Sequence, residues 1–361
     1  MMGKSRRMKS VVMFDAAYPP PVIGGKEKQA HLLSIGLLNI NVKVQVISFR
    51  HNGSESQYFE GVKIKRLKSG VFRPLSIFLN LLKSRLSASI LHIHTPSRIG
   101  RLVAVFGKLI GFSIVFKFPG QSLIEYKSFL DRISWDLVFR CSDALVVLES
   151  DTYQALLRNR NASSRIRMMV NGVVLGLPIQ FNDKLVVQLL FVGRLVELKR
   201  CVDLIHACSI LKKKDFKFSL RIVGDGPERQ SLKNIVQNLD LEDYIIFEGY
   251  REDTLSIMSE SDVLVLPSRT EGMSNVILEA MSIGLPVVAT NVGATGQLLG
   301  GFGRHFVVPP LSPVMLSKVI EKIIGNKKLR YEYSRYLYFR CKERFSVERI
   351  AEDYNKMYDE F

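Results

Sequence analysis

Residues 261–294 read SDVLVLPSRTEGMSNVILEAMSIGLPVVATNVGA, and this stretch decides the fold. It begins with a short apolar run, VLVLP, and ends with a second, PVVAT, and a mostly apolar helical segment lies between them. Short apolar strands that alternate with helices indicate a parallel sheet buried on both faces. The loop SRTEGMSN follows the first strand, at the sheet edge where doubly wound folds bind ligands.

The same alternation of strand and helix extends over the whole chain. In the second half we expect strands at 189–193, 219–224 and 245–249, and in the first half at 10–15, 42–49, 90–94, 112–118 and 143–150. We therefore predict an α/β protein with two doubly wound, Rossmann-like domains that face a central cleft. The predicted boundaries are 1–172 for the first domain, 173–345 for the second, and 346–361 for a C-terminal helix that could cross back to the first domain.

Composition narrows the classes of function. The chain has 361 residues, 47% of them hydrophobic and 24% charged, which is typical of a globular protein. It contains no apolar run long enough to span a membrane and no signal-peptide core, so we expect a cytoplasmic protein. The four cysteines have neither metal-ligand spacing nor a disulfide pattern.

The net charge of +17 is concentrated in the first half of the chain. Residues 1–180 hold 26 Lys and Arg against 10 Asp and Glu, whereas residues 181–361 hold 25 against 24. This asymmetry indicates an anionic partner for the first half, and a generally basic, solvated surface is the alternative. A nucleic-acid-binding protein would need exposed aromatic residues among the cations or a known module, and neither is apparent, so we expect no nucleic acid partner.

Two glutamates, Glu271 and Glu279, flank the start of the helix in the opening stretch. Ser274 or Asn275 can cap this helix, and the backbone of 272–275 can present N–H groups to an anion. Carboxylates accept hydrogen bonds from sugar hydroxyls, so the two could hold separate parts of one extended ligand. The alternative is a solvated Glu271 and a Glu279 on the helix surface, although Glu279 lies among apolar neighbours.

Two other loops of the second half carry candidate phosphate ligands. Arg194 and Lys199 lie between a strand and the start of a helix, where two cations and backbone N–H groups suit a pyrophosphate. Gly226 belongs to the tight turn GDG, which by itself marks many strand-to-helix turns. The alternative for Lys199 is that it simply covers the helix surface.

Taken in order, these segments resemble the retaining, family-4-type glycosyltransferases of the GT-B fold (glycosyl transferases group 1). The matching segments are FVGRLVELKR, RIVGDGPER, IIFEGY and the opening stretch itself. The resemblance covers 189 to about 325 strongly, and in the first half it extends to PVIGGKEKQAHLLSIGLLN, ILHIHTP, CSDALVVLES and VNGV.

The resemblance implies a nucleotide-sugar donor, most commonly a UDP- or GDP-sugar, that binds mainly to the second domain, and an acceptor that binds to the first. Arg194 and Lys199 match the diphosphate ligands of the family, Glu271 the residue that faces the donor sugar, and Glu279 the residue that holds the ribose. The backbone around Gly226 and the amides of Gly272, Met273, Ser274 and Asn275 fall at the nucleotide and sugar. Gly24 and Gly25 match a loop that closes over the phosphates.

The predicted chemistry is stabilisation of a diphosphate leaving group by Arg194, Lys199 and helix amides. The chain contains no Asp-x-Asp triplet, so we expect a metal-independent enzyme without a cofactor. The resemblance implies a hexosyltransferase that retains the anomeric configuration. Many members have a His-Gly pair where this chain has Phe118-Pro119-Gly120, a departure that removes the usual acceptor-side histidine. His94 is our acceptor-side candidate, and its neighbour His92 is expected to be buried.

Residues 63–88 combine several cations with apolar residues, which predicts docking on an anionic membrane surface and a lipid-linked saccharide as acceptor. The alternative is a core helix followed by ordinary basic loop residues. A membrane-bound acceptor fits an enzyme of cell-surface polysaccharide synthesis at the inner face of the membrane. The rival functions are a sugar-nucleotide epimerase on the same fold and an inactive glycosyltransferase-like binding protein.

Overall fold

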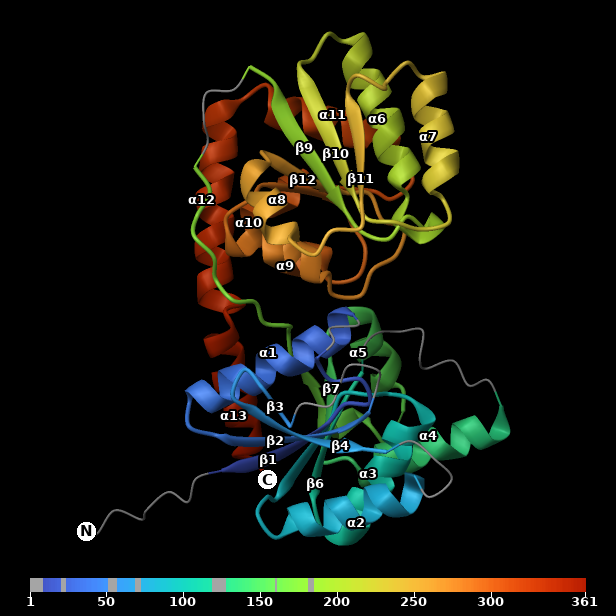
Figure 1. Ribbon diagram of the computed structural model, residues 1–361, viewed down its shortest axis with the longest axis vertical. Coiled ribbons are helices and arrows are strands. Elements are labelled where there is room, and N and C mark those ends of the chain that lie inside the picture. Colours follow the sequence, from blue (N-terminus) through green and yellow to red (C-terminus); the bar gives the residue numbers. More distant parts are fainter. Residues whose placement is uncertain are drawn as a thin grey trace, which may run out of the picture. The chain divides into compact units, whose positions relative to one another are not determined.

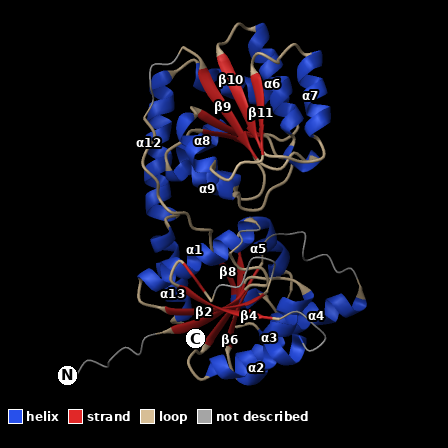
Figure 2. Ribbon diagram, viewed as in Figure 1, coloured by secondary structure: helices blue, strands red, loops and turns tan. Residues whose placement is uncertain are grey.

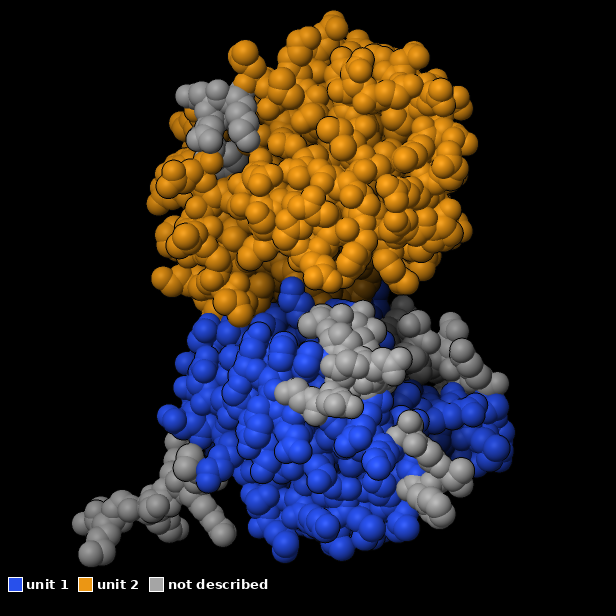
Figure 3. Space-filling model, in the orientation of Figure 1, with its two compact units in different colours: residues 1–172, 347–361 blue, residues 173–346 orange. Residues whose placement is uncertain are grey.

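The computed structural model describes residues 9–20, 24–50, 57–68, 73–118, 128–159, 161–180 and 185–361. The chain forms two compact units, which Figure 3 shows in different colours. Unit 1 comprises residues 1–172 together with 347–361, and unit 2 comprises residues 173–346. Both are parallel α/β units, with helices around a central sheet (Figure 2), which confirms the predicted fold class. The cleft predicted between the two domains stays a prediction.

Unit 1 is built around an eight-stranded sheet with the order β3-β4-β2-β1-β5-β6-β7-β8. Only β3, which pairs with β4, is antiparallel to its neighbour. The strands are β1 (Ser10–Phe14), β2 (Lys43–Phe49), β3 (Tyr58–Phe59), β4 (Val62–Leu67), β5 (Ile90–Ile93), β6 (Ser113–Lys117), β7 (Ala144–Val147) and β8 (Ile166–Met168). The helices are α1 (Gly25–Asn39), α2 (Arg73–Arg85), α3 (Arg98–Ile110), α4 (Phe129–Cys141), α5 (Ser150–Leu157), the 3-10 turn η2 (Ser163–Arg165) and α13 (Val347–Tyr358).

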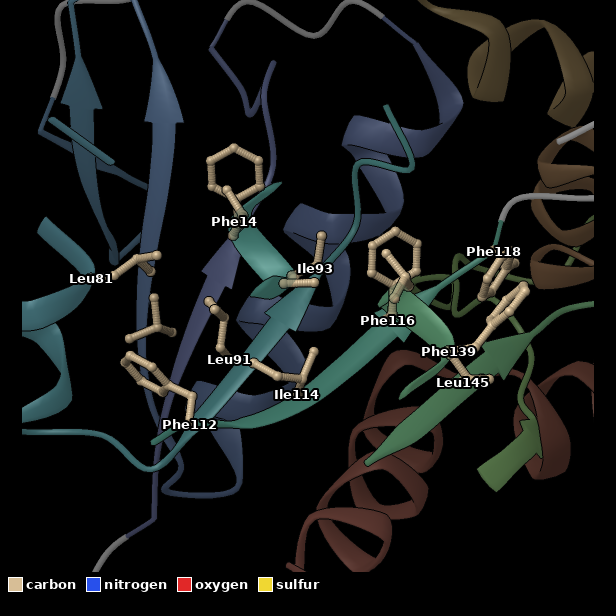
Figure 4. Close-up of a cluster of buried hydrophobic side chains, with 14 of the residues drawn as sticks. Phe14, Leu81, Leu91, Ile93, Phe112, Ile114, Phe116, Phe118, Phe139 and Leu145 are labelled. Carbon is tan, nitrogen blue, oxygen red and sulfur yellow. The ribbon is translucent and has the colours of Figure 1, made fainter. Parts of the chain in front are cut away.

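Alternation along each strand of unit 1 sends side chains to two separate cores. In β1, Val12 and Phe14 pack on one face with α2, α3 and α4, whereas Val11 and Met13 pack on the other with α1 and α13. Figure 4 shows part of the first core, including Phe14, Leu91 and Phe116. Both faces of the sheet are therefore covered, as continuously apolar strands require.

Helix α13 belongs to the core of unit 1 although it follows unit 2 in the chain (Figure 1). Its buried side chains Ile350, Tyr354 and Tyr358 join the core that α1 covers. Helices α1 and α13 approach closely at Gly36. An ideal Cβ built on Gly36 of α1 would lie only 2.9 Å from the Cβ of Ala351. The second face of the sheet is therefore completed only by residues beyond 346.

Unit 2 is a six-stranded parallel sheet with the order β11-β10-β9-β12-β13-β14. The strands are β9 (Val187–Val192), β10 (Phe218–Val223), β11 (Ile245–Gly249), β12 (Val263–Leu266), β13 (Val287–Thr290) and β14 (Val307–Val308). The helices are α6 (Cys201–Lys213), α7 (Arg229–Asn238), α8 (Thr254–Glu260), α9 (Asn275–Ser282), α10 (Thr295–Gly303), α11 (Pro313–Ile324) and α12 (Lys327–Arg344), with the 3-10 turns η3 (Glu197–Lys199) and η4 (Arg304–Phe306).

The segment 63–88, which the sequence predicts as one basic, apolar unit, is not continuous. Residues 62–67 form strand β4, and helix α2 begins only at Arg73. Lys63 and Lys65 alternate with buried residues along the strand, so their charges reflect strand periodicity. Only the helical part can present an amphipathic face, and residues 69–72 lie outside the described residues.

We predict that Ala351→Leu destabilises unit 1 by about 1–3 kcal/mol, because the larger side chain overpacks the contact with Gly36. Fluorescence of Trp135, the single tryptophan of the chain and a core residue of unit 1, reports the unfolding of this unit in urea. The control Glu352→Leu, at an exposed position of α13, should change the stability by less than about 0.5 kcal/mol. Equal effects of the two variants would contradict the close packing of α1 on α13.

Candidate functional site

The loops that follow β9 and β12 meet at the point where the strand order of unit 2 reverses. β10 and β11 lie on one side of β9, and β12, β13 and β14 lie on the other. Such a switch point leaves room beyond the carboxyl ends of the strands and is where doubly wound sheets bind ligands. A backbone hydrogen bond of 2.8 Å from Arg269 N to Leu198 O joins the two loops. This edge of the sheet is the candidate site.

Lys199 and Glu271 form an ion pair across this switch point. Lys199 Nζ lies 2.5 Å from Glu271 Oε1, and the two side chains are 26% and 14% exposed. Lys199 ends the 3-10 turn η3 after β9, and Glu271 lies in the loop between β12 and α9. A partly buried cation and carboxylate, 72 residues apart in sequence, are therefore brought together where a ligand can reach both.

Two residues beneath the pair hold the carboxylate in place. The Ser268 hydroxyl, which is buried, donates a 2.8 Å hydrogen bond to Glu271 Oε1. The Thr290 hydroxyl, at the end of β13, donates to Ser268 O at 2.5 Å. The sequence analysis did not identify either residue as part of the site. Ser268 directly follows the apolar run VLVLP, and Thr290 ends the apolar run PVVAT. Glu271 is thus positioned by the ends of two neighbouring strands.

The backbone of the Glu271 loop is held by the turn after β13. Ala294 N donates to Gly272 O at 2.9 Å. Gly293 has φ +51°, and an ideal Cβ there would lie 2.1 Å from Glu271 O and 2.3 Å from Gly272 O. Only glycine permits both this backbone conformation and this approach. Gly293 therefore fixes the position of residues 271–272.

Helix α9 begins beside the ion pair without a side-chain cap. Ser274 occupies the N-cap position, one of the two positions that the sequence predicts, but its hydroxyl makes no capping hydrogen bond. Met273 and Ser274 are buried, and Asn275 is half-buried in the first turn. Glu279 lies one turn beyond Asn275 and is half-buried. The first N–H groups of α9 thus receive no hydrogen bond from the Ser274 side chain and remain suited to an anion.

The second predicted cation, Arg194, is exposed and makes no ion pair with any residue that the structure describes. Its loop is nevertheless fixed, since Leu195 N donates to Asp225 O at 2.9 Å and Glu228 N donates to Leu195 O at 3.0 Å. Gly226 lies against this loop, and an ideal Cβ at Gly226 would lie 2.3 Å from Leu195 O. The predicted residues after β9, β10 and β12 therefore come from loops that contact one another.

We predict that Gly293→Ala destabilises unit 2 by at least about 2 kcal/mol, because the added methyl group meets the carbonyl oxygens of residues 271 and 272 at a positive φ. Gly296→Ala is the matched control, since its Cβ would meet only Asn291 Oδ1, at 3.5 Å, within helix α10. This control should be neutral or stabilising by up to about 1 kcal/mol. Chemical unfolding followed by circular dichroism distinguishes the two, and comparable stabilities would contradict this role of Gly293.

In unit 1, the predicted loop glycines lie at the start of α1. Gly24 is the N-cap residue, in extended conformation, and Gly25 is the first residue of the helix. The Glu27 carboxylate lies close to Gly24, with its Oε2 3.0 Å from the ideal Cβ position there. A negative side chain therefore already faces this helix N-terminus. The predicted closure of the loop over phosphates stays a prediction.

His94, the acceptor-side candidate, is buried in a polar cluster at the switch point of unit 1. The cluster comprises Asp15 after β1, His92 and His94 at the end of β5, Lys117 at the end of β6, and Tyr354 and Tyr358 of α13. The rings of His92 and His94 lie 4.2 Å apart between centroids, and His92 Nδ1 lies 2.6 Å from the Tyr358 hydroxyl oxygen. His92 therefore has the buried position that the sequence predicts. Pro119 and Gly120, which replace the expected His-Gly pair, lie outside the described residues.

Burial shifts the ionisation of this cluster. It lowers the pKa of both histidines well below the ordinary value, with a smaller contribution from the charge of Lys117. It raises the pKa of Asp15 to about 6 and lowers that of Lys117 to about 8, while the charge of Asp15 partly opposes the latter. Lys117 Nζ also donates to Asn171 Oδ1 at 3.1 Å. His94 is thus held neutral near pH 7.

We predict that the stability of unit 1 rises with pH between 8 and 10.5 because of Lys117. Its folded pKa of about 8 lies below the ordinary value of 10.5, so in this window the unfolded chain binds more protons. The difference in the free energy of unfolding between the wild type and Lys117→Met should increase by roughly 3 kcal/mol from pH 8 to pH 10.5. Urea unfolding followed by Trp135 fluorescence measures it, and the exposed Lys63→Met is the control. A constant difference between wild type and Lys117→Met would contradict the prediction.

Comparison with known proteins places unit 2 in a family. Residues 180–338 match the family model described as glycosyl transferases group 1. The resemblance drawn from the sequence motifs is thereby confirmed for the half of the chain that carries the Lys199–Glu271 pair.

Two glycosyltransferases are similar in sequence to this chain, one over about half of the chain and the other over most of it. An uncharacterized glycosyltransferase of Haemophilus influenzae is 32% identical over 167 residues, which are 46% of this chain and 47% of the relative. An uncharacterized glycosyltransferase of Methanocaldococcus jannaschii is 26% identical over 93% of this chain and 91% of its own length. The chain thus matches about half the length of the first relative and nearly all of the second.

Solved structures share the fold of this chain over almost its full length. The structure of Anabaena HepE in complex with UDP-glucose matches with a TM-score of 0.79 at 17% identity, covering 98% of this chain and all of that one. A lipopolysaccharide outer core galactosyltransferase, WaaB, matches with a TM-score of 0.70 at 17% identity. These likenesses confirm the GT-B fold class.

Within the described ranges, no three His, Cys, Asp or Glu side chains are grouped so that they could hold a metal ion. None of the described helices combines the length and apolarity needed to cross a membrane.

Proposed function

We propose that the protein is a retaining, metal-independent glycosyltransferase that moves a hexose from a nucleotide-sugar donor to a saccharide or lipid-linked saccharide acceptor. The observation that carries this proposal is the Lys199–Glu271 pair at the switch point of a group 1 domain. The pair offers a cation for a diphosphate and a carboxylate for sugar hydroxyls within one ligand's reach. The HepE complex with UDP-glucose supports a UDP-sugar as the first donor to test.

The residues act on the leaving group and on donor orientation. When the anomeric bond breaks, negative charge develops on the diphosphate, and Lys199, Arg194 and the first amides of α9 would stabilise it. Glu271 would bind hydroxyls of the donor sugar, and Glu279, one turn into α9, would hold the ribose. Because Ser268 and Thr290 fix Glu271 before any ligand arrives, little reorganisation is needed at the moment of reaction.

The acceptor side of the proposal rests on unit 1. Helix α2 exposes Leu75, Leu79 and Leu82, buries Ile77 and Leu81, and ends with Lys83 and Arg85. An amphipathic helix with cations beside an exposed apolar face suits the surface of an anionic membrane. A relative from Staphylococcus aureus carries the name capsular polysaccharide biosynthesis glycosyltransferase, and it is 24% identical over 62% of this chain. We therefore place the enzyme at the cytoplasmic face of the membrane, in cell-surface polysaccharide synthesis.

We predict that one class among UDP-, GDP- and ADP-sugars raises the melting temperature of the protein in the presence of EDTA, because ligand binding stabilises the folded state. Glu271→Gln and Lys199→Met should each weaken this binding at least about tenfold, a loss of about 1.4 kcal/mol. The controls Glu252→Gln and Lys213→Met change exposed residues of the same unit and should bind as the wild type does. Calorimetric titration gives the dissociation constants.

The outcomes separate the proposal from its rivals. A stabilisation that persists unchanged in Glu271→Gln and Lys199→Met would contradict this site. Conversion of the sugar nucleotide without any acceptor, seen by NMR of the product, would indicate an epimerase instead. Binding without turnover in the presence of saccharide and lipid-linked acceptors would indicate an inactive binding protein.

A further inference from the structure

A groove between α3 and α4 lies outside the machinery described above. The two helices pack side by side in unit 1 (Figure 1). An open cavity of about 450 Å³ lies between them. Cavities of this size hold small ligands. The groove is lined by Arg98, Arg101, Leu102 and Val105 of α3 and by Ser128, Leu130, Asp131, Ser134 and Leu137 of α4 or its cap.

One end of the groove is polar and positively charged. Both helices follow parallel strands, β5 and β6, so they begin at the same end, with Arg98 first in α3 and Ser128 as the N-cap of α4. Arg98 is exposed and makes no ion pair with a described residue. Ser97 caps α3 and Ser128 caps α4, and Asp131 lies in the first turn of α4, so Arg98 is the group that favours an anion at that end.

The wall at this end holds a buried charge with unused hydrogen-bonding capacity. The Arg101 side chain is only 9% exposed, and its Nη2 lies 2.6 Å from Asp131 Oδ1. Its guanidinium carbon lies 4.7 Å from the ring centroid of Trp135. Arg101 Nε is buried and has no hydrogen-bond partner within the described part of the chain. Asp131 neutralises the charge of Arg101. The charge of Arg98 is not neutralised within the lining, so the lining has a net charge of about +1.

The remainder of the groove is apolar. Leu102 and Val105 of α3 face the trough from one side, and Leu130 and Leu137 of α4 line the other. The apolar character continues onto the outer surface of α4, where Phe129, Leu130, Ile133 and Leu137 are 76%, 76%, 42% and 44% exposed. An exposed apolar row beside a charged groove is unusual for a surface that faces only water.

We propose that the α3–α4 groove binds a lipid phosphate, with the phosphate at Arg98 and the apolar chain along Leu102, Val105, Leu130 and Leu137. The inference rests on the proposed function, because it names the chemical class of acceptor or carrier lipid that reaches unit 1. The exposed row on α4 would enter the apolar part of the bilayer and lead the chain into the groove. Charge complementarity at one end and apolar lining at the other favour this occupant over a free saccharide.

Dodecyl phosphate, below its critical micelle concentration, tests the proposal on the full-length protein. The single tryptophan, Trp135, contacts Arg101 in the groove wall and reports binding by fluorescence. We expect saturable binding of dodecyl phosphate, at least tenfold weaker binding of dodecanol, and no saturable response to inorganic phosphate at the same concentrations. Binding of inorganic phosphate as tight as that of dodecyl phosphate would overturn the assignment of a lipid.

Two variants with matched controls locate the site. Arg98→Gln should weaken dodecyl phosphate about tenfold without changing dodecanol, whereas Arg132→Gln, on the exposed surface of α4, should leave both unchanged. Ser134→Phe fills the trough and should abolish saturable binding of both probes. Ser231→Phe is its control, because both serines lie in a helix and donate to the carbonyl oxygen three residues earlier. If Ser134→Phe does not fold, Leu137→Gln replaces it.

The remaining outcomes are equally decisive. Unchanged binding in Ser134→Phe, or binding only above the critical micelle concentration, would overturn the proposal. Concentration-dependent dimerisation without lipid that Ser134→Phe abolishes would assign the groove to a second copy of the chain. The assay uses no sugar nucleotide, so loss of lipid binding would not bear on the donor site. Lys199→Met should bind dodecyl phosphate as the wild type does.

Discussion

The parallel arrangement of the strands is the constraint on which both candidate sites depend. Because parallel strands run in one direction, every loop that follows a strand meets the others at a single edge of the sheet. In unit 2 this brings together the loops after β9, β10, β12 and β13, and in unit 1 it brings Asp15, His94 and Lys117 together. The chemistry of each unit is thus concentrated where the strand order reverses.

Local periodicity is the part of this structure that the sequence predicts well. The short apolar runs and the helices between them predict most strands of both sheets, and the loop at 267–274 falls between β12 and α9 as expected. Strand β4 was missed because its alternating lysines resemble a basic segment, although this alternation is itself a strand signal. The short strand β8 was missed for a related reason, since a run of three residues carries almost no periodicity.

Contacts between distant residues are beyond such reasoning. No spacing rule links Lys199 to Glu271, and only the order of strands in the sheet makes them neighbours. The supporting hydroxyls of Ser268 and Thr290 were equally hidden, because their role depends on β12 lying beside β13. The burial of His92 could be anticipated from strand alternation, whereas its hydrogen bond to Tyr358 required a helix 266 residues away.

The return of α13 to unit 1 has a consequence for the order in which the molecule folds. Unit 2 is one continuous segment, so it can acquire its structure as soon as its own residues have left the ribosome. Unit 1 begins earlier but lacks the cover for one sheet face until residues 347–361 have been made. The part of the chain that is synthesised first is therefore the last to be completed, and meanwhile Val11, Met13 and their neighbours remain only partly covered.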